Sequence, residues 1–451
     1  MPNHTLEIHS LGPIKECTLT VNRFTVLTGP QSNGKSTIAK AVYFFRTVKQ
    51  DILNIMMQGG PRAVVGDITY AAWEPALKQK MRDKFLQLFG TSWIMPDQME
   101  LKYTYTSQCQ MRVFLRPDFL NDGKNLVDFE FSPSFQAYLR DLDSRSFTNI
   151  SADEKSREED RLADLLDDPY ETAFIPAGRN LITLLTAQLN YIFTSLDAPQ
   201  LRNIDYVTRR YTELILKLKP LFETGMIGML ADAASTSEQI ARYKRSRNLI
   251  RLLLNTAEAV LHGTYRCVGG EERLYLDENQ YVKINYASSG QQEIVWVFNL
   301  LFYYLLEGKK VLLILEEPES HLYPDSQELI AQALSLFHNS GNAVLSTTHS
   351  PYVLGTYNYM LLAGQVPSNR HDLLQQELAQ PYWLHPAAVS AYHVHDGKMD
   401  NALSCEDGLT LIENALIDGA SQSINRKAER FIELIDAGDD DDKHKQLHAP
   451  T

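Results

Sequence analysis

Cysteine is scarce in this sequence, and the positions of the few present exclude two classes of site. Only four cysteines occur among 451 residues, and no two stand in a CxxC pair. Zinc sites and disulfide frameworks both need cysteines at short, regular spacings. The four are Cys17, Cys109, Cys267 and Cys405. We expect them to be small, buried residues of a reduced, cytoplasmic protein.

Long apolar runs are missing as well. The richest run, residues 295–306, falls well short of the ~20 residues of a membrane-spanning helix and is typical of a buried core helix. The N-terminus lacks the charged, apolar and small-residue regions of a signal peptide. Both absences predict a cytoplasmic location and no membrane partner.

Positive charge is in deficit, since the formal net charge is -13. An acidic chain is a poor general binder of nucleic acid, so such binding would need a local basic patch. One stretch, residues 241–251, has this character. Its basic residues are Arg242, Lys244, Arg245, Arg247 and Arg251. This stretch is either a face that contacts phosphate or an acidic protein, or a solvated helix face balanced by the acidic segment 151–168.

What the sequence does contain begins with a glycine-rich loop, GPQSNGKST, at residues 29–37. It lies between a short apolar strand pattern and a helix pattern, which is the context a phosphate-binding loop requires. Glycines allow the tight turn that aims backbone N–H groups at phosphates. Lys35 is predicted to reach the β- and γ-phosphates, and the Ser36 hydroxyl to bind Mg²⁺. The predicted nucleotide-binding residues of the loop are Gly29, Asn33, Gly34, Lys35, Ser36 and Thr37.

Two further apolar strand patterns end in residues suited to catalysis. The first, from residue 311, ends in Glu316 and Glu317, and the second, from residue 343, is followed by His349. Carboxyl ends of parallel strands open onto the ligand. Glu316 is predicted to orient water on Mg²⁺, Glu317 to polarise the attacking water, and His349 to sense the γ-phosphate. Taken alone, each pattern is also common in purely structural positions.

A second candidate anion site precedes the apolar helix pattern that starts near residue 290. Small residues at a helix N-terminus expose N–H groups and hydroxyls. The residues are Ser288, Ser289, Gly290 and Gln291. Since the first loop already holds the phosphates, the simplest use is to bind the γ-phosphate of a nucleotide held by another subunit. The alternative is an ordinary serine N-cap.

Apolar strands alternate with helices, which predicts an α/β fold with a largely parallel sheet. A hairpin is expected around residues 277–279. The predicted nucleotide-binding head comprises residues 1–50 and 265–365. The insertion between these parts, 51–264, is expected to be β-rich around 99–132 and helical over 180–262. A hairpin and a helix at 366–435 are expected to pack on the head, followed by a flexible acidic tail at 436–451. The tail contains DDDDK, which resembles a protease-cleavage tag.

The four motifs, in this order, resemble the ATP-binding-cassette (ABC) ATPase head: the phosphate loop, the signature SSGQQ (288–292), EEP (316–318) and THS (348–350). LGPIKE (11–16), FIPAGRN (174–180), EEPESHLYP (316–324) and TTHSPYVL (347–354) resemble the overcoming-lysogenization-defect (OLD) and AAA-15/AAA-21 group of bacterial ATPases. The resemblance covers about residues 1–50, 170–185 and 265–435, and no Toprim nuclease pattern follows the histidine. It implies an ABC-type P-loop head with a mixed or parallel sheet and a largely helical insertion.

The resemblance also implies roles for the residues. ATP and Mg²⁺ would bind Lys35 and Ser36, the signature residues would act in trans across a head-to-tail dimer, Glu317 would be the general base and His349 the switch. Glu316 replaces the usual Asp, and the glutamine that such heads place near the metal has no identified counterpart, so turnover is expected to be slow. Two interpretations are open for Arg179. It is expected to contact phosphate or a neighbouring subunit, or else to form a structural salt bridge.

The chain further resembles the ATPase component of PARIS-type and, less closely, Septu-type anti-phage defence systems. This implies an ATP-driven switch that responds to a phage protein and controls a separate effector nuclease or toxin. Two other hypotheses stay open. One is a DNA-repair clamp of the recombination-mediator type, with ATP-gated DNA binding. The other is a scaffold that assembles on ATP without hydrolysing it.

Overall fold

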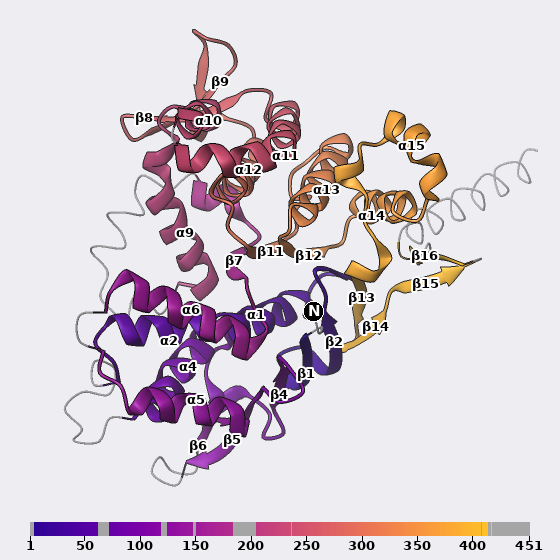
Figure 1. Cartoon of the computed structure of the whole chain (residues 1–451). Coiled ribbons are helices and arrows are strands. Elements are labelled where there is room, and N and C mark those ends of the chain that lie inside the picture. The colour runs from indigo at the N-terminus through magenta and orange to yellow at the C-terminus, as the bar shows by residue number, and fades with distance from the viewer. Residues whose placement is uncertain are drawn as a thin grey trace, which may run out of the picture.

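A six-stranded sheet forms the centre of the protein (Figure 1). The computed structural model describes residues 4–61, 72–118, 124–147, 150–183, 204–235, 237–406, 408–413 and 416. The strand order is β14-β13-β3-β12-β11-β7, and every neighbouring pair is parallel except β13–β14. The strands are β3 (Phe24–Thr28), β7 (Glu171–Ile175), β11 (Val311–Glu316), β12 (Ala343–Thr348), β13 (Val389–His395) and β14 (Lys398–Asn401). The predicted α/β class with a mixed, mostly parallel sheet is confirmed.

The parallel strands end level with one another. Thr28 of β3 pairs with Thr348 of β12, and Glu316 of β11 pairs with Thr347. The carboxyl ends therefore share one edge of the sheet, which is where α/β proteins bind ligands. The glycine loop, the two carboxylates and His349 all follow directly from these ends.

Two apolar cores cover the two faces of this sheet, and β11 shows how. Leu312 and Ile314 belong to one core, whereas Val311, Leu313 and Leu315 belong to the other. Strands buried on both faces read as continuous apolar runs rather than alternating ones. This explains why the sequence shows uninterrupted apolar stretches here.

The first core lies between the central sheet and a five-stranded antiparallel sheet of order β2-β1-β4-β5-β6. Its strands are β1 (His4–Leu11), β2 (Ile14–Val21), β4 (Glu100–Thr104), β5 (Gln110–Asp118) and β6 (Lys124–Phe131). The β-rich pattern expected around residues 99–132 is confirmed. Because β4 pairs with β1, the predicted head–insertion boundary at residue 51 separates strands of one continuous sheet.

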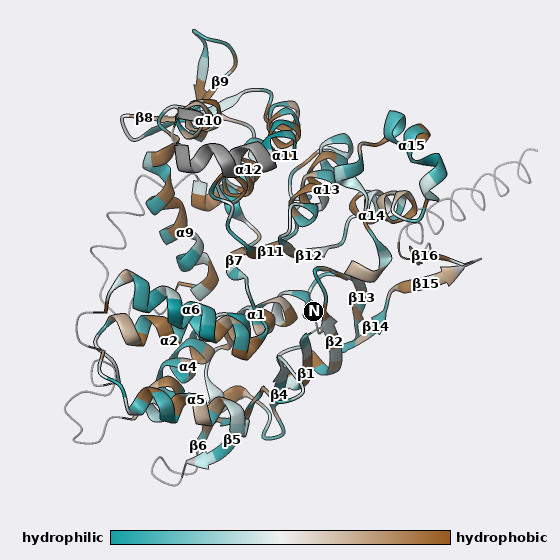
Figure 2. Ribbon diagram, in the orientation of Figure 1, coloured by the Kyte–Doolittle hydropathy of each residue, from teal (hydrophilic) through white to brown (hydrophobic). Residues whose placement is uncertain are grey.

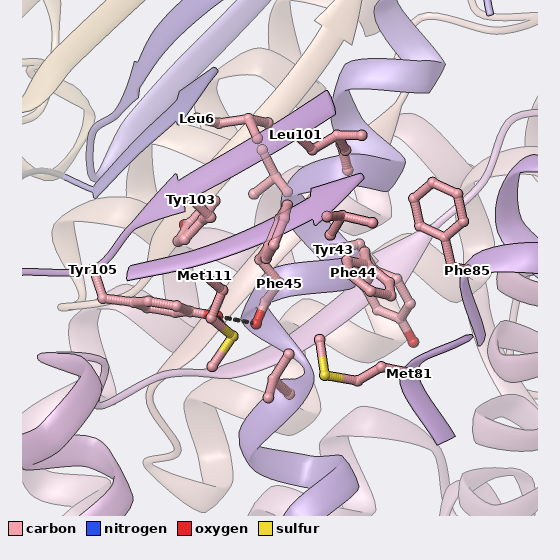
Figure 3. Packing of buried hydrophobic residues seen from close by; sticks show 14 of the residues in the cluster. Leu6, Tyr43, Phe44, Phe45, Met81, Phe85, Leu101, Tyr103, Tyr105 and Met111 are labelled. Atoms are coloured by element: carbon pink, nitrogen blue, oxygen red, sulfur yellow. Dashed lines mark hydrogen bonds between the residues drawn. The ribbon is translucent and has the colours of Figure 1, made fainter. Parts of the chain in front are cut away.

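Helix α1 (Lys35–Arg46) packs in this first core. Phe45 stacks on Tyr103 at 4.9 Å, and Phe44 meets Phe85 edge to face (Figure 3). The Tyr105 hydroxyl donates a hydrogen bond to the carbonyl of Phe45 at 2.6 Å. The helix pattern that follows the glycine loop forms two helices, because α1 ends at Thr47, whose hydroxyl bonds back to the helix, and α2 (Val48–Met57) begins directly after it.

Further helices cover the outside of the first core. They are α4 (Trp73–Phe89), α5 (Pro133–Asp143) and α6 (Ala152–Leu166). The charge-dense segment 151–168 forms α6, which begins with a capping box between Ser151 and Glu154. Figure 2 shows hydrophilic residues over α6 at the periphery, as expected for a solvated face.

The second core holds most of the remaining helices and two strands of a small antiparallel sheet of order β10-β9-β8. Its elements are α9 (Tyr206–Leu218), α10 (Gly225–Ser235), α11 (Ser237–Leu261), β8 (Thr264–Val268), β9 (Glu271–Tyr275), α12 (Ser289–Glu307), α13 (Pro324–Asn339) and α14 (Pro351–Ala363). The edge strand β10 (Tyr281–Lys283) and helix α15 (His371–Glu377) have no buried residue and lie outside this core. The hairpin expected around residues 277–279 is confirmed as β9–β10. Helix formation expected across 180–262 is confirmed for α9 to α11.

The C-terminal region contributes to the central sheet itself. The expected hairpin is β13–β14, and β13 lies parallel to β3, with Val389 opposite Phe24. A short two-stranded sheet, β15 (Leu403–Glu406) and β16 (Leu409–Ile412), follows. The helix predicted within 424–435 and the tail 436–451 lie outside the described residues.

The cysteines and the helices can both be compared with what the sequence predicts. Cys17, Cys109 and Cys267 are buried as expected, whereas the expectation is wrong for Cys405, which is exposed; all four are free thiols. Burial raises the pKa of Cys17 to about 12, which keeps it an unreactive thiol. None of the helices described has the length and apolar character needed to cross a membrane.

Candidate nucleotide-binding site

The glycine loop joins β3 to α1, and its two key glycines are required by both conformation and space. Gly29 has φ 136° and Gly34 has φ 102°, a region that side chains with a β-carbon rarely adopt. A β-carbon at Gly29 would lie 2.1 Å from the carbonyl oxygen of Val394, and one at Gly34 would lie 2.4 Å from the Ile14 side chain. The loop is therefore packed tightly between β13 and the β1–β2 turn.

Lys35 is folded back onto this loop. Its Nζ donates hydrogen bonds to the carbonyls of Gly29 at 2.7 Å and Pro30 at 2.8 Å. Burial lowers the pKa of Lys35, while the nearby carboxylates of Glu317, Glu319 and Glu316 oppose the shift. A cation inside a glycine turn fits the predicted phosphate-binding lysine.

The other predicted loop residues differ in their surroundings. The Asn33 amide donates to Gln31 O at 3.1 Å, and its Oδ1 accepts the N–H of Asp396 at 3.0 Å, so this side chain braces the loop against the β13–β14 turn. Ser36 is exposed at the start of α1, and its hydroxyl lies near enough to the Glu316 carboxylate to lower the pKa of that group. Thr37 lies in α1 facing Gly12. Of these, Ser36 has the surroundings of a metal ligand.

Glu316 ends β11 as a buried carboxylate with 6% of its surface exposed. Burial raises its pKa, and the Ser36 hydroxyl and the Ala177 N–H oppose the shift. Its Oε2 accepts the Ala177 N–H at 3.2 Å, whereas the buried Oε1 has no partner among the described residues. A buried, unpaired carboxylate oxygen beside a serine hydroxyl fits Mg²⁺, which prefers oxygen ligands.

Glu317 has an unusual backbone. Its φ of 44° lies in the left-handed region, which costs free energy for a residue with a β-carbon. Its N–H donates to the carbonyl of Thr347 at 2.9 Å, which holds this conformation. The side chain opens onto a cleft of about 440 Å³, lined in part by Gln31, Glu319, Ser320, His349 and Tyr352. Strained residues of this kind cluster at functional sites.

His349 lies between two carboxylates. Its Nδ1 is 3.8 Å from Glu317 Oε1 and 3.5 Å from Glu319 Oε1. Glu319, which the sequence analysis missed, is 5% exposed and accepts hydrogen bonds from the Thr348 hydroxyl at 2.7 Å and the His349 N–H at 2.9 Å. The signal for it was available, because a third carboxylate follows two residues after the EE pair.

The signature residues form an N-cap in this chain. The Ser288 hydroxyl accepts the Gln291 N–H at 3.3 Å, and Gln291 Oε1 accepts the Ser288 N–H at 2.9 Å. A β-carbon at Gly290 would lie 2.7 Å from the carbonyl of His321, so α12 starts against the loop that follows β11. Ser289 is exposed. None of these four lines the cleft at Glu317, although Gly290 packs against His321, which does line it.

Arg179 is fully buried and forms a salt bridge with Glu293 at 3.0 Å. The structural alternative of the two sequence interpretations is therefore the one observed. Its loop follows β7 and lies beside Glu316, since Ala177 donates to that carboxylate. Residues 176–180 contain no glutamine, so this loop does not supply the expected one.

The basic stretch 241–251 is described in part. Arg247 and Arg251 are exposed on α11. The side chains of Arg242, Lys244 and Arg245 lie outside the described residues. A basic face on this helix stays a prediction.

Comparison with known protein families shows to which family this chain belongs. The family described as AAA ATPase domain, AAA-15, matches residues 94–354, which is more than half of the chain. The chain belongs to this family. The match includes the signature, both strand ends and His349, and the phosphate loop lies N-terminal to it. An AAA ATPase domain implies nucleotide binding, which agrees with the loop described above. No curated protein matches the chain.

Solved structures of SMC head domains are similar to this AAA ATPase at low identity. An SMC head bound to the C-terminal winged-helix domain of ScpA shares 12% identity over 91% of this chain and 98% of its own, with a TM-score of 0.40. The SMC head domain from Thermotoga maritima shares 11% identity over 92% and 98%, with a TM-score of 0.34. One from Pyrococcus furiosus, bound to the C-terminal domain of ScpA, shares 13% over 96% and 100%, with a TM-score of 0.34.

Proposed function

We propose that this AAA ATPase binds ATP with Mg²⁺ at the carboxyl edge of the central sheet and hydrolyses it slowly. The observation that carries the proposal is the convergence of Lys35, three carboxylates and His349 on this edge from three separate strands. Mg²⁺, when bound, would neutralise phosphate charge next to Ser36 and Glu316. An isolated phosphate-loop match would not bring these groups together.

The side chains divide the work by their surroundings. Lys35 is a buried cation for the β- and γ-phosphates, already held by loop carbonyls that phosphate oxygens would replace. Glu317 faces the cleft and accepts the proton of the attacking water. His349 is positioned by Glu319 beside that carboxylate. Glu316 is one methylene longer than the usual Asp and has a raised pKa, which supports slow turnover.

We also propose that the site is completed by a second copy of the chain. The Ser288–Gln291 turn lies outside the cleft of its own subunit, and Ser289 and Gly290 would present backbone N–H groups to the γ-phosphate held by a partner. Head-to-tail dimers would then enclose ATP between two heads.

Substituting Glu317→Gln tests both statements. We expect ATP turnover to fall by about 100-fold or more while ATP binding persists, and a larger ATP-bound assembly to accumulate, as measured by mass photometry or light scattering. Glu278→Gln, on the exposed β9–β10 turn, is the matched control and should behave as wild type. Unchanged turnover in Glu317→Gln would instead favour the non-hydrolysing scaffold. Failure to accumulate the assembly would reject the trans arrangement.

The biological role that we propose is an ATP-dependent switch in anti-phage defence, of the PARIS-type rather than the Septu-type, controlling a separate effector nuclease or toxin. Support comes from the AAA-15 family match and the motif resemblance. Co-purification of a native effector with Glu317→Gln in ATP, and its release on phage challenge, would test the role. Salt-sensitive, ATP-dependent duplex binding that is lost in Arg247→Glu would favour the DNA-repair clamp.

A further inference from the structure

Arg179 and Glu293 form an ion pair buried between the loop after β7 and the second turn of α12. Arg179 is 0% exposed and Glu293 1%. Besides the 3.0 Å contact with Arg179 Nε, the Glu293 carboxylate accepts the backbone N–H groups of Arg179 and Asn180, both at 3.1 Å. Buried charges persist only when paired and hydrogen-bonded. The pair therefore holds the loop firmly to α12.

The same guanidinium also holds the end of β11. Its Nη1 donates to the carbonyl of Glu316 at 2.6 Å and to that of Pro176 at 3.2 Å, and its Nη2 donates to the carbonyl of Glu317 at 3.0 Å. One planar group thus binds α12 on one side and the backbone of both candidate catalytic carboxylates on the other. Only arginine offers this many donors in a rigid fork.

The contact between Arg179 and the carbonyl of Glu317 helps to hold a strained backbone. Glu317 keeps its φ of 44° because its two backbone polar groups are both held. The N–H donates to Thr347 at 2.9 Å, and the carbonyl accepts Arg179 at 3.0 Å and the Ser320 N–H at 3.1 Å. A backbone in this region persists only when its surroundings over-determine it. Loss of the Arg179 contact would leave the carbonyl with the Ser320 N–H of its own turn, so that turn could move and take the Glu317 side chain from its place in the cleft.

We infer that Arg179 is a positioning residue for hydrolysis, and that the Arg179–Glu293 pair transmits the position of α12 to Glu316 and Glu317. The inference rests on the proposed function. Helix α12 starts with the Ser288–Gln291 turn, so a second copy that contacts this turn would restrain Glu293 and, through Arg179, the general base. In the described part of the chain, Arg179 forms no hydrogen bond with the phosphate loop. Substitution of Arg179 should therefore lower the rate of ATP turnover while leaving ATP affinity nearly unchanged.

Arg179→Lys and Glu293→Gln test the inference. Lysine keeps the charge but cannot serve α12 and the strand-end carbonyls together. We expect kcat to fall by about 10- to 100-fold, as for small misplacements of catalytic groups, with ATP affinity within about 3-fold of wild type. Hydrogen exchange should become faster at residues 317–320 and remain unchanged in α1. Glu293→Gln should give a smaller fall in kcat.

Asp51→Asn is the matched control, because it breaks another buried pair, Lys84–Asp51, in the first core. It should lower the melting temperature without changing kcat per folded molecule. The inference is overturned if Arg179→Lys and Glu293→Gln behave as Asp51→Asn does, or if ATP affinity and kcat fall together. If wild type itself shows no ATP turnover, the proposed function fails instead.

A double-mutant cycle tests transmission separately. Ser289→Arg obstructs the exposed start of α12, and we expect it to lower kcat on its own. If both substitutions act through the same contacts, the double variant should have a kcat only slightly lower than that of Ser289→Arg alone. Independent, multiplicative losses would leave Arg179 as a local support of Glu317 and reject the link to α12.

Discussion

The two cores on either side of the central sheet bury charge in different ways. In the first core, Asp168 pairs with Arg46 at 3.0 Å and Lys49 at 3.6 Å. These contacts join the end of α6 to α1 and α2. At the second core, Arg179 pairs with Glu293 and also binds the backbone of the strand end that carries the candidate base. Similar pairs thus have different consequences, depending on where their remaining hydrogen bonds end.

The largest expected effect comes from removing a partner in the first core. Asp168→Ala leaves Arg46 and Lys49 without their carboxylate, and breaking a buried pair costs about 3–5 kcal/mol. Asp168 is 0% exposed, so solvent does not screen the loss. Chemical denaturation should show this change in unfolding free energy, with ATP affinity of the folded protein retained. Asp153→Ala, exposed on α6, should change stability by less than about 0.5 kcal/mol. Loss of ATP affinity in Asp168→Ala would show that this pair supports the site as well.

The next effect concerns the contact between β13 and the glycine loop. Gly29→Ala would place a β-carbon 2.1 Å from Val394 O, and such overpacking costs about 1–3 kcal/mol. The loop must shift to relieve it, so we expect ATP affinity to fall by at least about 10-fold, as measured by fluorescent-nucleotide titration. Gly59→Ala has a similar φ of 97° with no atom within 4 Å and serves as control. Equal ATP affinities in the two variants would contradict the role of β13.

The buried carboxylate of Glu316 should make the stability of the protein depend on pH. Burial holds the pKa of Glu316 above its ordinary value. A carboxyl with a raised folded-state pKa favours folding at low pH, and this contribution is lost as the pH rises through that pKa. Nucleotide-free Glu316→Gln should therefore be more stable than wild type at about pH 7, with the gap closing as the pH falls toward 4.5. A gap that does not change with pH would mean that the Glu316 pKa is unshifted.

The smallest effect is expected for a neutral group in the first core. Tyr105→Phe removes the 2.6 Å hydrogen bond to the carbonyl of Phe45 (Figure 3). Loss of one such bond costs about 1 kcal/mol, and the site at the N-terminal end of α1 should be unaffected. Thermal unfolding with and without ATP would measure both. An ATP-dependent difference between Tyr105→Phe and wild type would show that the first core and the site are coupled.

Much of the fold and of the site was predictable from local patterns. The glycine loop, the apolar strands before Glu316 and His349, and the β9–β10 hairpin all depend on residues close in sequence, and the structure confirms these elements. The helix pattern after the glycine loop does not show the break at Thr47, because a hydroxyl that bonds back to the helix leaves no mark in the hydrophobic periodicity. Glu319 is visible in the sequence as a third carboxylate after the EE pair, but its role depends on contacts with Thr348 and His349 at the end of a different strand.

The sequence by itself determined that a phosphate loop, two carboxylates and a histidine each stand at a strand end, because a continuous apolar run and the polar residues that follow it form a local pattern. Only the tertiary structure decided what lies around them. It placed β13 against Gly29, joined β4 to β1, and directed Arg179 to the strand end rather than to phosphate. These contacts join residues about a hundred or more positions apart, and their cost or benefit arises only when burial removes water from both partners.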